Sequence, residues 1–147
     1  MTPFKTQLSI RWADIDPNFH MRHSVYYDCA AQMRTEVLAQ MGITMNAMQS
    51  GHFGPVLFRE ECSFFHEIAF GDNIFLTAKM SRLRKDYTRF SIQHEFLRED
   101  GTVCARITID GGWVNTRTNQ LTVPPRIAKS VVRAIPKTDD FTWEEAV

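Results

Sequence analysis

A ten-residue stretch near the N-terminus, DIDPNFHMRH at positions 14–23, holds the side chains best suited to acid–base chemistry. Asp14 and Asp16 lie two positions apart, and His20 and His23 follow closely. A carboxylate can act as a general base or as a nucleophile, and free backbone amides at a helix start can hold a carbonyl oxygen. The stretch therefore suits chemistry on an acyl group.

Each of these residues also has an ordinary structural interpretation. Asp16 precedes Pro17, and aspartates in this setting are frequent in turns and at helix starts. We expect Asp14 to stabilise the turn. His20 either hydrogen-bonds to the turn backbone or orients Asp16, and His23 is expected to act through its backbone amide rather than its side chain.

A long amphipathic helix is predicted directly after this stretch. Apolar residues recur there at spacings of three and four, namely Tyr26, Ala30, Met33, Val37 and Met41. Gly42 follows the last of them, and glycine is the usual residue just beyond a helix end. The acidic stretch would thus lie at the N-terminus of a buried helix, where backbone N–H groups are unpaired.

Alternating apolar and polar residues predict strands in the rest of the chain. The first covers positions 4–12, and four more follow the helix at about positions 56–66, 74–80, 90–96 and 103–114. Turns near Gly71 and Gly101 join them, and Gly111–Gly112 suggests a bulge. A short helix is expected at 127–134. This order predicts one α+β domain over residues 1–135, followed by a loose polar tail at 136–147.

The composition excludes several classes of function. A formal net charge of zero argues against a protein that binds nucleic acid by neutralising phosphates. No apolar run is long enough to span a membrane, and the N-terminus lacks the apolar segment of a signal peptide. The three cysteines are far apart and form no metal-ligand pattern. We therefore expect free thiols, a cytoplasmic location, and neither a metal ion nor a cofactor.

The spacing of the acidic stretch resembles that of a known enzyme family. Asp14, Asp16, His20 and Met21 form the pattern D-x-D-x-x-x-H-M, and Arg34 follows on the predicted helix. This pattern is similar to that of the 4-hydroxybenzoyl-CoA thioesterase family. The resemblance implies a hotdog fold, in which an antiparallel sheet of about five strands wraps around one long central helix. It also implies a homodimer, with the two sheets side by side, or a homotetramer.

The same resemblance implies hydrolysis of an acyl-CoA, or of a related pantetheine thioester, in a cleft between subunits. It carries Asp16 over as the catalytic carboxylate, and the backbone amide near His23 as the donor to the thioester carbonyl. His20 is expected to support Asp16 or to shape the carbonyl site. The reaction suits this set of groups, because a thiolate leaves readily and needs only one base or nucleophile and one oxyanion donor.

Further residues are expected to contact the substrate, namely Phe19, Tyr26, Tyr27, Arg84 and Lys85. Phe19 would shape the acyl pocket. Of the two tyrosines, one is expected to face the core and the other to line that pocket. Arg84 and Lys85 belong to a basic cluster that either lines a solvated turn or clamps the phosphates of CoA.

Departures from the family pattern leave alternatives open. Phe19 stands where relatives commonly have glycine, and a phenylalanine adopts a positive φ only at a cost. One alternative is a hotdog hydratase that acts on an enoyl thioester. The hydratase pattern D-x-N-P-x-H fits poorly, because Asp16 replaces the asparagine and His20 lies one residue too far. The other alternative is a non-catalytic thioester-binding protein of the same fold.

Overall fold

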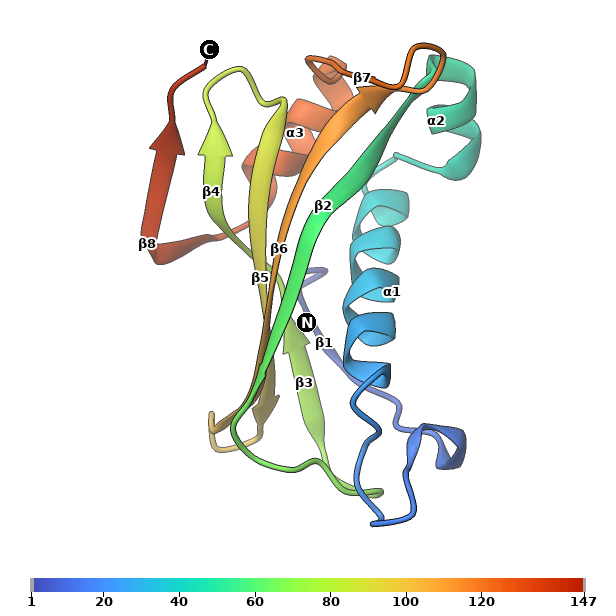
Figure 1. Ribbon diagram of the computed structural model, residues 1–147, viewed down its shortest axis with the longest axis vertical. Coiled ribbons are helices and arrows are strands. Elements are labelled where there is room, and N and C mark those ends of the chain that lie inside the picture. The colour runs from blue at the N-terminus through green and yellow to red at the C-terminus, as the bar shows by residue number, and fades with distance from the viewer. Residues whose placement is uncertain (1, 147) are drawn as a thin grey trace.

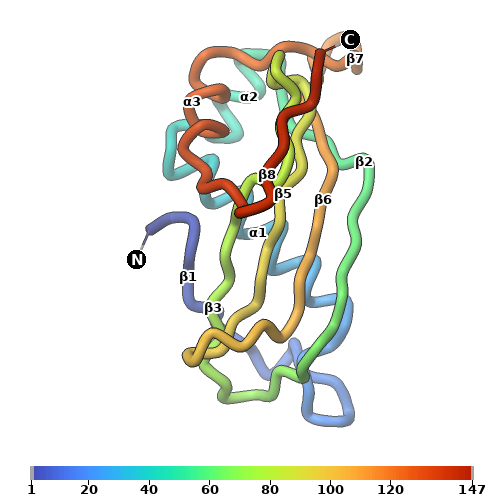
Figure 2. The backbone as a smooth tube through the Cα atoms, turned by 90° about the vertical axis from the view of Figure 1, so that its left-hand side faces the viewer, coloured from blue at the N-terminus to red at the C-terminus, as the bar shows by residue number. Residues whose placement is uncertain are grey.

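One long helix, α1 (Val25–Gln40), lies against the inner face of a strongly curled, mostly antiparallel sheet (Figure 1). The computed structural model describes residues 2–146. Turned by 90°, the molecule shows its strands side by side with α1 behind them (Figure 2). This arrangement confirms the predicted α+β class and the hotdog fold.

The central strand of the sheet is β5 (Arg89–Arg98). It pairs on one side with β6 (Val103–Asn115), and on the other with β3 (Ile74–Thr77) and β4 (Lys79–Arg84), which occupy its two ends. Beyond β6 lies β2 (Phe53–Phe64), antiparallel to it along its length. Within residues 2–146 the far side of β2 pairs with no strand, so β2 is an open edge of the sheet.

Shorter elements complete the molecule. Strand β1 (Lys5–Gln7) pairs with β3, β7 (Gln120–Leu121) pairs with the end of β6, and β8 (Lys137–Glu144) runs parallel to β4. Helix α2 (Met45–Gly51) precedes β2, and α3 (Arg126–Ala134) matches the short helix predicted at 127–134. None of the helices in the described part of the chain is long and apolar enough to cross a membrane.

The core lies between α1 and the inner face of the sheet. The helix buries four of the five residues of the predicted stripe, Tyr26, Ala30, Met33 and Val37. The fifth, Met41, lies just past the end of α1 and is only partly buried. Alternate residues of β5 and β6 face it, including the opposed pair Ile92 and Ile109. Complete burial of one such apolar side chain stabilises the fold by about 1.5–3 kcal/mol. The helix is therefore held mainly by packing, since the side chain of its N-cap residue Ser24 makes no capping hydrogen bond.

The segment after Pro136 was predicted to be a loose tail, and this prediction is wrong, because it forms β8. The backbone N–H of Lys85 donates to the carbonyl of Glu144 at 2.9 Å, and the Arg84 guanidinium pairs with the Glu144 carboxylate at 3.2 Å. Backbone pairing and an ion pair together fix this segment on β4.

The first strand is also shorter than predicted. Only Lys5–Gln7 pairs as a strand, and Trp12–Asp14 forms a 3-10 helix. There the Asp14 carboxylate accepts a hydrogen bond from the backbone N–H of Arg11 at 2.9 Å and another from its guanidinium at 2.8 Å. These local bonds curl the chain and end the alternation of an extended strand.

The irregularity predicted at Gly111–Gly112 exists, but the extra residue lies on the neighbouring strand. The register of β2 slips by one residue at Phe58, opposite Gly111. A Cβ added at Gly111 would lie 2.6 Å from the carbonyl oxygen of Val56, so the two strands approach closely only because this residue is glycine.

Candidate active site

The acidic stretch folds into a tight loop before α1. The backbone N–H of Asp16 donates to the carbonyl of His20 at 2.9 Å, and the N–H of Phe19 donates back to the carbonyl of Asp16 at 3.0 Å. The loop is anchored to the segment between β2 and β3, because the Met21 N–H donates to the carbonyl of Ile68 at 2.6 Å. These bonds hold Asp16 at a fixed place beside the start of the helix.

The Asp16 carboxylate is partly buried, and its two oxygens differ. Oδ1 accepts hydrogen bonds from the backbone N–H groups of Asn18 at 2.9 Å and His20 at 3.2 Å. No residue in the described range 2–146 donates to Oδ2. One oxygen therefore stabilises the turn, as an ordinary turn aspartate does, while the other stays available to a substrate.

Phe19 adopts a left-handed backbone conformation, which glycine adopts more readily than any other residue. Its φ is +65°, and the loop closes despite the Cβ. For a non-glycine residue this conformation costs about 1–2 kcal/mol. The ring of Phe19 is 67% exposed and lies outside the pocket described next.

An open pocket of about 380 Å³ lies between this loop, the first turn of α1 and the end of β2. We call it the Asp16 pocket. Its lining includes Asp16, His20, His23 and Tyr26 from the loop and helix, and Phe64 and Glu67 from the end of β2 and the segment after it. The structure thus brings together all three residues predicted to be catalytic, although only Tyr26 of the predicted substrate contacts joins them.

The two tyrosines were predicted to take separate positions, one in the core and one in the pocket. In the structure Tyr26 occupies both positions, because it packs in the core and also lines the pocket. Its ring stacks edge-on against Phe64 and Phe96, each with a centroid distance of 5.0 Å. Burial raises the pKa of Tyr26 to about 12, so the phenol stays protonated at neutral pH. Tyr27 is half-buried, packs against the core and does not line the pocket.

His23 lies two residues before the first residue of α1, at the N-terminus of that helix. The first hydrogen bond at the helix start runs from the Val25 N–H to the Arg22 carbonyl at 2.9 Å. Among the described residues, no acceptor takes the backbone N–H of His23. A free N–H at a helix N-terminus attracts a negatively charged oxygen, since the helix dipole adds to the hydrogen bond.

The side chain of His20 forms a pair that the sequence did not predict. His20 Nε2 lies 3.1 Å from Glu67 Oε2. Glu67 is 74% exposed, so the pair sits at the rim of the Asp16 pocket. No local pattern marks Glu67 or Phe64 as site residues, because both join the loop only through the curl of the sheet.

Arg84 and Lys85 do not reach the Asp16 pocket. They lie at the end of β4, at the opposite end of the molecule from the acidic loop (Figure 1). Arg84 pairs with Glu144 at 3.2 Å and Lys85 with Glu145 at 2.5 Å. Carboxylates from the C-terminal segment thus already contact both cations.

Asp14 has a structural position. Its carboxylate is buried, and the hydrogen bond from the Arg11 guanidinium lowers its pKa below the usual value. Glu60, on β2, forms an ion pair with Arg34 of α1, with 3.7 Å between the charged atoms. Across residues 2–146, no group of three or more His, Cys, Asp or Glu side chains is arranged to hold a metal ion.

Solved structures share this fold at low sequence identity. The protein SAV2348 from Staphylococcus aureus, solved in complex with CoA, matches with a TM-score of 0.82 and 18% identity over 96% of this chain and 89% of that one. A 1,4-dihydroxy-2-naphthoyl-CoA thioesterase from Synechocystis matches with a TM-score of 0.78 and 14% identity, over 89% and 96% of the two chains. A gentisyl-coenzyme A thioesterase matches with a TM-score of 0.72 and 19% identity, over 85% and 98%.

Comparison of the sequence itself gives a family. No curated protein matches the chain at a significant level. The sequence model of the thioesterase-like superfamily, however, matches residues 10–135. The match includes the acidic loop, α1 and every strand from β2 to β7, and the chain therefore belongs to the thioesterase-like superfamily.

Proposed function

We propose that the protein hydrolyses an acyl-CoA, or a related acyl-pantetheine, to the free acid and the thiol, in the manner of 4-hydroxybenzoyl-CoA thioesterases. The observation that carries this proposal is the Asp16 pocket. There a carboxylate oxygen without a partner among the described residues and the free backbone N–H of His23 lie beside the same helix start. Solved proteins of this fold include named CoA thioesterases and a complex with CoA, which supports the substrate class.

In this proposal each group has one role. The His23 N–H donates to the thioester carbonyl oxygen and stabilises the negative charge that develops there. Asp16 either takes a proton from the attacking water or attacks the carbonyl carbon itself, which gives an anhydride that water then opens. In both routes the C–S bond breaks and the electron pair leaves on sulfur as a thiolate, whose conjugate acid has a pKa near 8.5.

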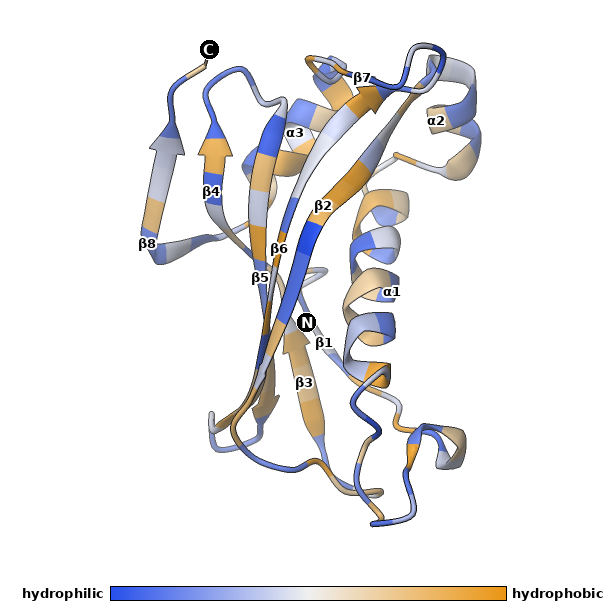
Figure 3. Cartoon of the chain, viewed as in Figure 1, coloured by the Kyte–Doolittle hydropathy of each residue, from blue (hydrophilic) through white to orange (hydrophobic). Residues whose placement is uncertain are grey.

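The open edge of β2 supports a homodimer. Leu57, Phe58 and Phe64 on this strand are 46%, 48% and 53% exposed. Hydropathy colouring shows a hydrophobic section of β2 that is followed along the strand by a polar one (Figure 3). A long edge strand with exposed apolar side chains invites pairing with another strand. Antiparallel pairing of two β2 strands would place the second copy beside Phe64, and hence beside the Asp16 pocket.

We propose that the reaction takes place in the cytosol, because the three cysteines within residues 2–146 are free thiols, as is usual in a reducing compartment. Cys29 and Cys62 are half-buried and Cys104 is buried, and none forms a disulfide. Burial raises the pKa of the Cys29 and Cys62 thiols to about 11, so both stay protonated and unreactive at neutral pH.

The test is thiol release from a panel of short, long and aromatic acyl-CoAs, followed with a thiol-reactive dye. We expect Asp16→Asn to lower kcat about 100-fold or more, because it removes the base or nucleophile. Asp28→Asn, an exposed carboxylate on α1, is the matched control and should keep full activity. Unchanged turnover in a folded Asp16→Asn protein would refute the assignment. Loss of enoyl absorbance without thiol release would favour the hydratase, and binding without turnover would favour a thioester-binding protein.

A further inference from the structure

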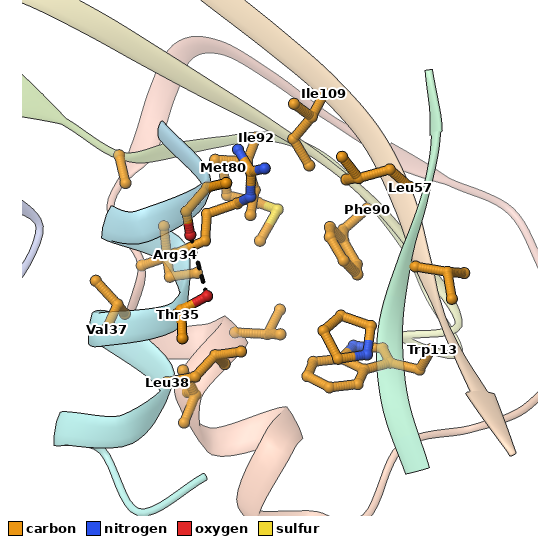
Figure 4. Close-up of a pocket in the computed structure, with 17 residues that line it drawn as sticks. Arg34, Thr35, Val37, Leu38, Leu57, Met80, Phe90, Ile92, Ile109 and Trp113 are labelled. Carbon is orange, nitrogen blue, oxygen red and sulfur yellow. Dashed lines mark hydrogen bonds between the residues drawn. The ribbon is translucent and has the colours of Figure 1, made fainter. Parts of the chain in front are cut away.

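A second pocket lies at the other end of α1, between that helix, β2, the sheet and α3 (Figure 4). We call it the Arg34 pocket. Its volume is about 210 Å³, and its walls are mostly apolar, with Leu38, Leu57, Phe90 and Ile109 among them. Arg34 is the one charged side chain among the described residues that line it. Its ion pair with Glu60 compensates this charge without a direct hydrogen bond, because the two side chains are 3.7 Å apart.

Arg34 is held in place by a chain of hydrogen bonds. Its Nη1 lies 3.0 Å from His94 Nε2, and His94 Nδ1 lies 3.0 Å from the carbonyl oxygen of Thr77. Burial, together with the nearby guanidinium, lowers the pKa of His94 to about 3, so the ring is neutral. A neutral ring with Nδ1 donating to a carbonyl must accept at Nε2, and Arg34 is the donor it accepts from.

This network leaves most of the guanidinium unused. The group carries five N–H donors, and one of them bonds to His94. Glu60 lies 3.7 Å from Nη2, which is too long for a hydrogen bond. The Arg34 side chain is only 16% exposed. None of its nitrogens, however, is both fully buried and without a hydrogen-bond partner. Its free N–H groups therefore reach open space beside the pocket.

We propose that the Arg34 pocket binds the end of the acyl group, and that Arg34 donates a hydrogen bond to an oxygen atom carried there, either a hydroxyl or a carboxylate. The inference rests on the proposed thioesterase function and adds the substrate class. A volume of about 210 Å³ equals about seven water volumes of ~30 Å³, which suits a six-carbon chain or one ring with an oxygen substituent.

The position of the pocket fits this role in a dimer. Within one chain the Asp16 pocket adjoins Phe64, at the end of β2, whereas the Arg34 pocket adjoins Pro55 and Leu57, near its start. When two β2 strands pair antiparallel, the end of one lies beside the start of the other. The thioester at Asp16 of one copy would then direct its acyl group toward the Arg34 pocket of the second copy.

The test uses three thioether analogues that cannot be hydrolysed, namely hexyl-CoA, 6-hydroxyhexyl-CoA and 5-carboxypentyl-CoA, with binding measured by titration calorimetry. We expect the wild type to bind one oxygen-bearing analogue about 10- to 100-fold more tightly than hexyl-CoA, as a hydrogen bond to a charged group implies. The oxygen-bearing analogue that binds more tightly shows whether Arg34 recognises a hydroxyl or a carboxylate on the acyl group. The double variant Arg34→Met/Glu60→Gln, which leaves no unpaired carboxylate, should lose this preference and still bind hexyl-CoA.

Two further variants make the result specific. Leu38→Trp should weaken the binding of all three analogues, because the larger side chain fills the pocket. Arg106→Met is the matched control, because Arg106 of β6 pairs with Glu95 of β5 at 2.8 Å and lies outside the pocket. The preference should persist in this variant. A wild type without preference, or a double variant that keeps it, would overturn the proposal. Because the analogues are not hydrolysed, an Arg34-dependent binding preference supports the proposal independently of turnover. Absence of acyl-CoA turnover would refute only the thioesterase function.

Discussion

Replacing Phe19 by glycine should stabilise the protein, although it removes a large aromatic side chain. The residue has a φ of +65°, a conformation in which a Cβ costs about 1–2 kcal/mol. Glycine loses about 0.5–1 kcal/mol more backbone entropy on folding than alanine does. The ring is 67% exposed, so its removal sacrifices little packing. The midpoints of these two terms differ by about 0.75 kcal/mol, so Phe19→Gly should be more stable than Phe19→Ala by about this amount.

The alanine variant is the control that makes this prediction sharp. Both substitutions remove the ring, and they differ only in the Cβ and in backbone freedom. The free energy of unfolding should be measured for both by urea denaturation, and a difference of this size corresponds to about 1–4 °C in Tm for a chain of this length. An alanine variant as stable as the glycine variant would show that Phe19 is not strained. If Phe19 also contacts substrate as predicted, both variants should raise KM equally.

Three further predictions concern charged side chains in the loop and elsewhere. Asp14→Asn should lower the free energy of unfolding by about 1–2 kcal/mol at pH 7. Because its pKa is lowered in the folded protein, this contribution is present above the unfolded pKa near 3.9 and disappears as the pH falls through the folded value, so variant and wild type should converge in urea titrations at the lowest pH. Glu67→Gln should lower kcat/KM less than tenfold across the pH–rate profile, since an exposed ion pair contributes little. A larger loss of kcat/KM would mean that Glu67 takes a direct part in the reaction. Charge reversal at Arg84 and Lys85 should raise the KM for acyl-CoA if they clamp its phosphates, and an unchanged KM would leave them only their contacts with the C-terminal segment.

The elements that local sequence determines were predicted correctly. The spacing of Tyr26, Ala30, Met33 and Val37 marks the buried face of α1, and these four residues are buried in the structure. Alternation likewise identified β5 and β6, and the turn between them contains Gly101 with a φ of +88°, as its hairpin signal requires. Such patterns succeed because each side chain reports directly which face of its element is buried.

The error at the C-terminus and the gaps in the predicted site arose where distant pairing decides the structure. The sequence of β8 alternates weakly, and its position depends on parallel pairing with β4 and on Glu144 meeting Arg84. No local pattern contains that information. The same reason explains the incomplete site, because the loop residues are close in sequence whereas Glu67 comes from another segment. His94 falls within the strand predicted at 90–96, and its bond to Arg34 becomes visible only when β5 packs on α1.

The acidic loop shows why the two interpretations of Asp16 need not compete. A turn aspartate uses its carboxylate to accept backbone N–H groups, and Oδ1 does this with Asn18 and His20. Those same bonds restrict the rotation of the carboxylate, so that Oδ2 also keeps a fixed direction. A catalytic group benefits from such prior fixation, because less freedom is lost when substrate binds. Loosening the turn at Phe19 should therefore impair catalysis only if it also releases Oδ1, which links the stability test directly to the mechanism.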